Sequence, residues 1–199
     1  MFIKISQNNK GFTLIETLVS LLIFSVSIVA LVSVTASGVA DTRFSQKKQT
    51  AYLLAQEGIE MIRYARDSTV RFQGSWSLFL SGVEDCITPE GCDIDTQSLA
   101  TNGSGLTVVP CAQSQNSPFI CSELRRDPLT GFYRSIPTLA PSEVSGFTRK
   151  INIEEVDPNS NEELEVISSV SWVHGGRTYS VTMSEVINNW VRPHPDLQP

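Results

Sequence analysis

The most marked pattern in the sequence is an apolar run near the N-terminus. Residues 17–40 contain no charged residue and no proline, and leucine, valine and isoleucine predominate. A helix of these 24 residues would be roughly 36 Å long, because an α-helix rises about 1.5 Å per residue. The hydrocarbon core of a bilayer is about 30 Å thick. The run therefore predicts a helix that can cross a membrane.

Beyond residue 40 the pattern becomes amphipathic but still favours a helix. Residues 41–68 contain no proline, and small and apolar residues recur there at three- and four-residue spacings. We expect one helix over residues 12–68, roughly 85 Å long, whose second half packs on a globular head. On its exposed side Glu60 is favourably spaced from Arg63, and Arg63 from Asp67. The expected packing stripe consists of Ala51, Leu54, Ala55, Gly58, Ile59, Ile62 and Ala65.

Residues 69–131 read as an irregular region, because glycine, serine, proline, asparagine and threonine dominate it. We expect Trp76, Leu78 and Phe79 to pack this region back on the helix. The other elements expected here are a short strand at Leu106–Cys111 and a hairpin whose strands, Phe119–Arg126 and Phe132–Ile136, flank a turn at Asp127–Gly131.

The C-terminal third alternates like a β-sheet. A strand is expected at Phe147–Val156, and two more at Leu164–His174 and Arg177–Ile187, on either side of the two-residue turn signal Gly175-Gly176. That turn fixes the register, which places Trp172 opposite Tyr179, Val170 opposite Val181, and Ser168 opposite Met183. The predicted fold class is α+β, with a long N-terminal helix packed on a C-terminal antiparallel sheet.

One carboxylate, Glu16, stands at the head of the apolar run. An ionisable group in a membrane helix is costly, which makes it a candidate functional residue. A secretory signal, with an apolar region of about 7–15 residues, is too short to explain the run. A plain single-pass anchor explains its length but not Glu16. A buried core helix is the third alternative, and 24 uncharged residues argue against it.

The residues Lys10-Gly11-Phe12-Thr13-Leu14-Ile15-Glu16 resemble the processing site of type IV prepilins and the related pseudopilins. The resemblance implies that a membrane-bound prepilin peptidase cuts between Gly11 and Phe12 and that the new amino group of Phe12 is methylated. It also implies that Glu16 acts in assembly. In a bundle of such helices, Glu16 of one subunit can meet the Phe12 ammonium of another, so that two costly buried charges satisfy each other.

The motif and the composition together divide the chain into six parts. Residues 1–11 are the expected leader, 12–40 the transmembrane and assembly helix, and 41–68 its amphipathic continuation. Residues 69–131 form a variable region with disulfides, 132–192 the antiparallel β-sheet head, and 193–199 a loose tail.

Charge and orientation follow from the same division. The chain carries a net charge of −6, and loss of the basic leader, with Lys4 and Lys10, brings it to about −8. That balance leaves no basic face for phosphates, so no nucleic-acid partner is expected. The processing motif predicts a single-pass membrane protein with a cytoplasmic N-terminus and an extracytoplasmic head, part of a cell-surface or periplasmic filament after assembly.

All four cysteines, Cys86, Cys92, Cys111 and Cys121, lie in the part expected outside the cytoplasm. Their spacing favours two local disulfides, Cys86–Cys92 and Cys111–Cys121, although four cysteines permit three connectivities. Zinc binding is the alternative, but neither histidine of the chain lies near them in sequence. An oxidising compartment favours disulfides.

No enzyme signature is present in the sequence: it has no glycine-rich phosphate loop, no Gly-x-Ser-x-Gly and no His-Glu-x-x-His. We therefore expect no catalytic residues, no cofactor and no metal. The acidic stretch Asp157–Glu165 could bind calcium, but it lacks the spacing of a known calcium loop, and a solvated turn is the simpler interpretation.

The sequence thus predicts a structural subunit of a type IV pilus-like filament. Its expected partners are the prepilin peptidase, other pilin or pseudopilin subunits, an inner-membrane assembly platform and membrane lipid. A minor subunit is favoured for two reasons. Major type IV pilins often have a proline within the apolar helix, whereas the first proline here is Pro89. In addition, Ala51–Glu60 is similar to the corresponding segment of PilV-type minor pilins. One alternative is a pseudopilin of a type II secretion or DNA-uptake machine. Another is a membrane-tethered extracellular binding domain that does not polymerise.

Overall fold

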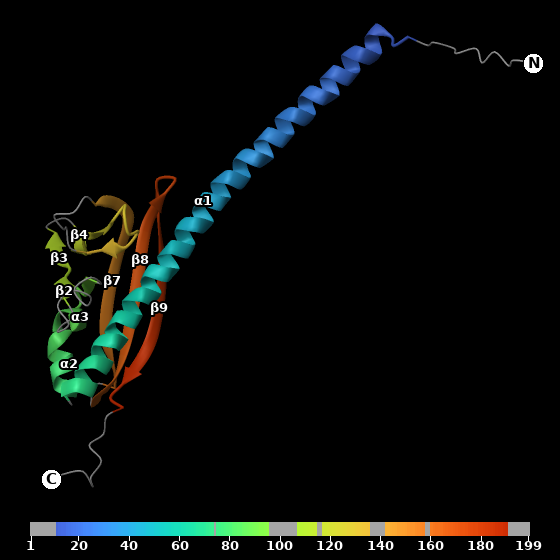
Figure 1. Ribbon diagram of the computed structural model, residues 1–199. Coiled ribbons are helices and arrows are strands. Elements are labelled where there is room, and N and C mark those ends of the chain that lie inside the picture. Colours follow the sequence, from blue (N-terminus) through green and yellow to red (C-terminus); the bar gives the residue numbers. More distant parts are fainter. Residues whose placement is uncertain are drawn as a thin grey trace, which may run out of the picture. The chain divides into compact units, whose positions relative to one another are not determined.

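The computed structural model describes residues 11–73, 75–95, 107–114, 117–135, 142–157 and 160–190. The chain divides into two compact units, Met1–Ser45 and Gln46–Pro199, each described here by itself. One long helix, α1 (Leu14–Gln73), contributes to both units (Figure 1). The long N-terminal helix predicted from the sequence is confirmed, and it continues about five residues beyond the predicted end.

In the first unit, α1 presents apolar side chains on every side, and none of its residues from 14 to 43 is buried. Among the helices that the structure describes, only α1 is long and apolar enough to cross a membrane. Hydroxyl groups on this part of the helix donate hydrogen bonds to backbone carbonyls four residues earlier, at 2.7–3.1 Å. A hydroxyl satisfied within its own helix can face lipid without a lost hydrogen bond. The residues that do so are Ser20, Ser25, Ser27, Thr35 and Ser37.

In the second unit, α1 buries all seven residues of the predicted stripe. At Gly58 the helix approaches the sheet closely. A Cβ atom placed on Gly58 would lie 2.8 Å from Ser168 Oγ and 3.1 Å from Ile151 Cδ1. Glycine is therefore required there for close packing rather than for its backbone freedom.

The described strands of the main sheet number seven, and all of their pairings are antiparallel. The three long strands β7, β8 and β9 lie side by side (Figure 1), while β1 and β5 both pair with β7. A separate two-stranded sheet joins β3 to β4. The strands are β1 (Cys92–Asp95), β2 (Thr107–Pro110), β3 (Ala112–Ser114), β4 (Ser117–Ile120), β5 (Glu123–Arg126), β6 (Tyr133–Arg134), β7 (Glu143–Asp157), β8 (Ser160–His174) and β9 (Arg177–Asn188).

The register of β8 and β9 agrees with the prediction. Trp172 lies opposite Tyr179, Val170 opposite Val181, and Ser168 opposite Met183. Gly175 and Gly176 form the turn, with φ values of +57° and +75° that L-residues rarely adopt. The buried face of the sheet packs on α1. The core contains Ile59, Ile62, Ile151, Ile153, Leu164, Val166 and Ile187.

The region after α1 is more regular than predicted. It contains two short helices, α2 (Trp76–Gly82) and α3 (Glu84–Ile87), followed by β1. Phe79 is buried and Trp76 packs against the core, but Leu78 is 47% exposed, so the prediction that Leu78 packs inward was wrong. Ser75 caps α2, and the helical period then turns Leu78 away from the face that carries Phe79.

Two other predictions need correction. The expected strand at Phe119–Arg126 is divided between β4 and β5, which belong to different sheets. Arg63 does bond to Glu60, at 2.8 Å, but its second partner is Glu185 on β9 rather than Asp67. The long guanidinium side chain reaches across to the sheet. Asp67 instead accepts hydrogen bonds from Arg66 and Trp190.

The short strand predicted at Leu106–Cys111 is found as β2, and the hairpin around Asp127–Gly131 is formed by β5 and β6. The tail at 193–199 and the leader at 1–10 lie outside the described residues. The acidic stretch Asp157–Glu165 is described only in part, as the paired ends of β7 and β8.

Candidate functional site

The N-terminal site comprises the last residues before α1 and the first turn of the helix. Gly11, Phe12 and Thr13 are not helical, and α1 begins at Leu14. Thr13 closes the end of the helix, because its Oγ1 accepts a hydrogen bond from the Glu16 N–H at 3.3 Å. The Thr13 carbonyl accepts from the N–H of Glu16 at 3.1 Å and from that of Thr17 at 3.3 Å. This is the geometry of an N-cap.

This cap leaves the Gly11–Phe12 peptide bond just outside the helix. Apart from Gly11 and its chain neighbours, no atom of the described residues lies within 4 Å of the place that a Cβ on Gly11 would occupy, and Phe12 is 81% exposed. A peptidase needs an extended, accessible segment, and a peptide bond inside an α-helix offers neither. With Thr13 as its N-cap, the helix therefore begins just after the peptide bond at which the resemblance implies cleavage.

Glu16 occupies the first turn of α1 and is exposed in the single subunit. The free N–H groups of a helix N-terminus favour a carboxylate and disfavour a cation. Cleavage would place the new ammonium of Phe12 at that same end, where it requires a carboxylate partner. Gly11, Phe12 and Glu16 thus lie together at the start of one helix.

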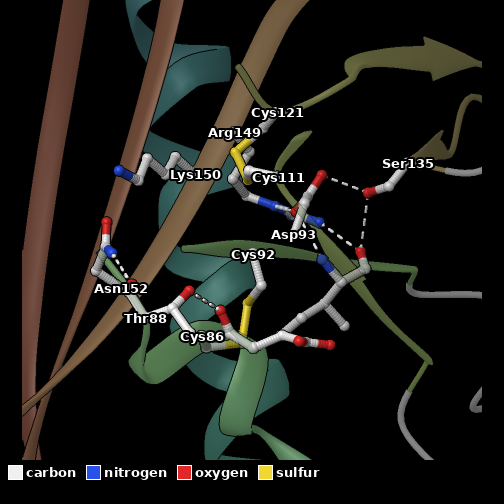
Figure 2. The surroundings of a disulfide bond; sticks show 12 residues. Cys86, Thr88, Cys92, Asp93, Cys111, Cys121, Ser135, Arg149, Lys150 and Asn152 are labelled. Carbon is white, nitrogen blue, oxygen red and sulfur yellow. Dashed lines mark hydrogen bonds and ion pairs between the residues drawn. A yellow bond between two sulfur atoms is a disulfide. The ribbon is translucent and has the colours of Figure 1, made fainter. Parts of the chain in front are cut away.

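A second cluster of charges lies buried in the head and was not predicted from the sequence. Arg149, on the core face of β7, is completely buried. Its Nε donates to Asp93 Oδ1 at 2.6 Å, and one terminal nitrogen donates to the carbonyl of Ile94 at 2.8 Å. The other terminal nitrogen donates to Glu57 Oε2 at 3.2 Å and to the Leu54 carbonyl at 3.3 Å. Figure 2 shows the Arg149 side chain reaching Asp93 from the neighbouring strand.

Both carboxylate oxygens of Asp93 accept hydrogen bonds. Its Oδ1 also accepts from the Ile94 N–H at 2.8 Å, and the Ser135 hydroxyl donates to its Oδ2. Burial raises the pKa of Glu57 above its ordinary value, and the nearby Arg149 offsets only part of this shift. The cluster joins α1, β1 and β7 through a charge that has many partners inside the core. No substrate is needed to explain it, and we assign it a structural role.

A sequence signal for this cluster did exist. Phe147, Ile151 and Ile153 alternate along one face of β7, and Arg149 has the same parity. An arginine at a core position requires buried acceptors. The sequence could not identify Asp93, because β1 was not predicted as a strand.

The two disulfides are those favoured by the cysteine spacing, Cys86–Cys92 and Cys111–Cys121. All four cysteines are therefore oxidised, which excludes them as zinc ligands. The first disulfide lies beside Asp93 (Figure 2), and its loop is held on β7. Lys150 Nζ donates to the Pro89 carbonyl at 3.0 Å, and Asn152 Nδ2 donates to that of Thr88 at 3.1 Å.

One comparison with known proteins gave a match. Residues 6–32 match the family model described as the prokaryotic N-terminal methylation motif. No curated protein and no solved structure matches the chain. The match includes Gly11, Phe12, Glu16 and two thirds of the apolar run, and it leaves the head uncovered.

The methylation motif indicates a precursor of the type IV pilin or pseudopilin kind. It implies processing by a prepilin peptidase and assembly with other pilin subunits. The architecture agrees with it, since a long apolar N-terminal helix continues into a segment packed on an antiparallel sheet.

Proposed function

We propose that this protein is a minor structural subunit of a type IV pilus-like filament. The observation that carries the proposal is the methylation motif, placed where a capped helix with an exposed apolar surface begins. The peptidase would cut the Gly11–Phe12 bond, the amino group of Phe12 would be methylated, and the subunit would leave the membrane for the fibre.

Before assembly, the apolar first part of α1 would reside in the bilayer. The hydroxyls that bond back to the helix support this, because they leave few polar groups unsatisfied in lipid. The two disulfides support an extracytoplasmic head, because such bonds persist in oxidising compartments. The N-terminus would then be cytoplasmic.

During assembly, Glu16 would pair with the Phe12 ammonium of a neighbouring subunit. Glu16 is exposed in the single subunit, so its carboxylate is accessible to another chain. Methylation of an amine keeps its positive charge, and the attraction survives it. The assembly platform in the inner membrane would supply the extraction step.

A minor role is favoured over that of the main filament subunit. Major type IV pilins often have a proline within the apolar helix, whereas α1 runs through 60 residues without one. Proline removes a helical hydrogen bond and bends the helix. A helix without proline would therefore differ in flexibility from the helices of the main subunits in such a fibre.

Mass spectrometry of the N-terminus of the protein, isolated from its own host, tests the processing step. We expect a mature chain that begins at methylated Phe12. The Gly11→Val variant should keep its leader, because a β-branched side chain crowds the peptide bond to be cut. The matched control is Gly38→Ala, inside α1, where a Cβ meets nothing within 4 Å and cleavage should be normal. A different mature start, or full cleavage of Gly11→Val, would contradict the proposal.

A further inference from the structure

The strands of the head run between two ends of opposite charge. The turn between β8 and β9 lies at one end, and the start of β7 lies at the same end, because Phe147 stands opposite Trp172. Strand β5 runs toward this end, where Arg126 stands opposite Glu143. The turn between β5 and β6 therefore lies there as well. We call this end, with both turns and the start of β7, the basic end of the head.

The basic end is also the end at which α1 enters the head. Lys47 Nζ donates a hydrogen bond to the carbonyl of Val173, just before the β8–β9 turn, at 3.1 Å. The apolar run ends at residue 40, and the seven helical residues from there to Lys47 rise only about 10 Å. When the apolar run spans a bilayer, the helix therefore keeps the basic end within reach of the membrane surface.

Positive charge is in excess at the basic end even when every carboxylate there is counted. Bonds from the Leu129 N–H and from other groups of the β5–β6 turn hold the pKa of Asp127 below its ordinary value, so Asp127 is counted as charged. The internal segments outside the described residues contain no charged residue and cannot alter the balance. The surface groups are the six cations Lys47, Lys48, Arg125, Arg126, Arg134 and Arg177, against the three carboxylates Glu123, Asp127 and Glu143.

Several of these cations are available to a ligand. Arg126 and Arg177 are exposed, and among the described residues neither has a carboxylate within ion-pair distance. The same holds for Arg134, which is partly exposed. A guanidinium with no carboxylate partner can bind a phosphate group through two hydrogen bonds.

The opposite end of the strands, which we call the acidic end, has the reverse balance. Residues 154–157, 160–165 and 185–188 contain no lysine or arginine. The last turns of α1, residues 60–73, add three arginines and two carboxylates, so this end remains strongly negative. Its strand carboxylates are Glu154, Glu155, Asp157, Glu162, Glu163, Glu165 and Glu185.

Exposed apolar side chains accompany the cations at the basic end. Leu129, in the β5–β6 turn, is 88% exposed, and Phe132 is 59% exposed. Val144 and Val173 are exposed at the same end. Surfaces that combine basic and apolar groups bind where lipid headgroups meet acyl chains, because the apolar groups enter the boundary and the cations bind lipid phosphates.

We propose that, while the subunit resides in the membrane, the basic end of its head docks on the bilayer surface and binds anionic phospholipid headgroups. The tether through α1, the excess of cations and the exposed apolar groups all favour a lipid surface as the occupant. The same surface repels the acidic end, so the head is held with its acidic end away from the bilayer. This inference rests on the membrane residence that forms part of the proposed function.

The test uses the full mature chain in vesicles, with a fluorescent label that reports contact with lipid. All four cysteines are paired, so the single added cysteine of Leu129→Cys takes the label selectively. Val186→Cys, at an exposed position of the acidic end, is the matched control. The measurement is quenching of the label by spin-labelled lipids. One set of vesicles contains equal parts of phosphatidylcholine and phosphatidylglycerol, and the other contains phosphatidylcholine alone.

In the anionic vesicles we expect quenching at residue 129 to exceed that at residue 186 about fivefold or more, and to fall severalfold in phosphatidylcholine alone. Adding Arg126→Glu or Arg177→Glu to Leu129→Cys should lower the quenching about fivefold. Arg71→Glu makes the same change of charge at an exposed position of the acidic end and should have no effect. Retention of both disulfides and of protease resistance verifies that the variants fold.

Three results would overturn the proposal: equal quenching at residues 129 and 186, equal quenching at residue 129 in the two kinds of vesicle, or no loss in Arg126→Glu and Arg177→Glu. In host membranes, a photo-crosslinker in place of Phe132 should capture lipid, and capture of a protein instead would also overturn it. Filament entry is scored separately. A head that docks on vesicles although the chain never enters filaments contradicts the proposed function and not the docking.

Discussion

Arg149 on β7 donates a hydrogen bond from Nε to Oδ1 of Asp93 on β1 at 2.6 Å, and both side chains are at most 2% exposed. The pair joins segments that are 56 residues apart in the chain. Glu57 extends the contact to α1, at 3.2 Å from the same guanidinium. One buried cation therefore organises the meeting of the long helix, the disulfide region and the sheet.

Removing the charge of Asp93 should destabilise the head strongly. In Asp93→Asn the guanidinium of Arg149 remains buried with its main anionic partner gone, and such changes typically cost about 3–5 kcal/mol. The measurement is the free energy of unfolding from urea titration, followed by tryptophan fluorescence.

Two further variants make that measurement specific. Adding Arg149→Met to Asp93→Asn should recover part of the loss, because the unpaired charge disappears. Arg63→Met removes a partly exposed ion pair and should cost about 1 kcal/mol or less. Equal losses of unfolding free energy in Asp93→Asn and Arg63→Met would show that the buried pair contributes no more to stability than the partly exposed one.

Glu57 should make stability depend on pH. Its pKa is raised above 4.5, mainly by burial, so the folded state holds this proton more tightly than the unfolded state. The contribution of Glu57 to stability is then greatest below pH 4.5 and falls as pH rises through the raised pKa. Compared with wild type, Glu57→Gln should become relatively more stable as pH rises from about 4.5 to the raised pKa of Glu57. At higher pH the difference in unfolding free energy between the two proteins should stay constant. A wild-type minus variant difference that is constant with pH would refute the shift.

Gly58 should reverse the usual effect of alanine in a helix. Glycine to alanine normally favours a helix by about 1 kcal/mol. At Gly58 the new Cβ would lie 2.8 Å from Ser168 Oγ and 3.3 Å from Arg149 Cδ, so we expect a loss of about 1–3 kcal/mol from overpacking. Gly38→Ala meets no atom within 4 Å and should be neutral or stabilising. Thermal unfolding of both variants in detergent measures the contrast, and a stabilised Gly58→Ala would contradict it.

The sequence predicted the parts of the fold that local pattern determines. The stripe from Ala51 to Ala65 follows from helical spacing, and the register of Trp172 with Tyr179 follows from the Gly175-Gly176 turn. The N-terminal motif predicts the start of the helix to within two residues, since residue 12 was expected and α1 begins at Leu14. Each of these features depends on neighbours in the chain, which one sequence contains in full.

The features that were missed depend on contacts between distant segments. β1 has only four residues, Cys-Asp-Ile-Asp, and although apolar and polar residues alternate in it, its shortness and its two aspartates, which are uncommon in strands, hide it in the sequence. Its pairing with β2 and β7 creates it. Arg149 was overlooked for the same reason, since its partner Asp93 lies on that strand. Leu78 is predicted to pack inward with the apolar residues near it, but the helical period of α2 turns it away from Phe79.

The central claim is that Glu16 joins subunits in a filament, and its most direct test is the partition of Glu16→Gln between membranes and sheared filaments. Cleavage after Gly11 does not need that charge and should proceed normally. In an assembled bundle the variant would leave a neighbour's Phe12 ammonium unpaired, a loss of about 3–5 kcal/mol for one side of a buried pair. The matched control, Glu60→Gln on the same helix, should enter filaments like wild type.

We therefore predict that cleaved Glu16→Gln accumulates in the membrane while its content in sheared filaments falls sharply below that of wild type and of Glu60→Gln. Incorporation of Glu16→Gln equal to that of wild type would contradict the account and would favour a membrane-tethered head that does not polymerise.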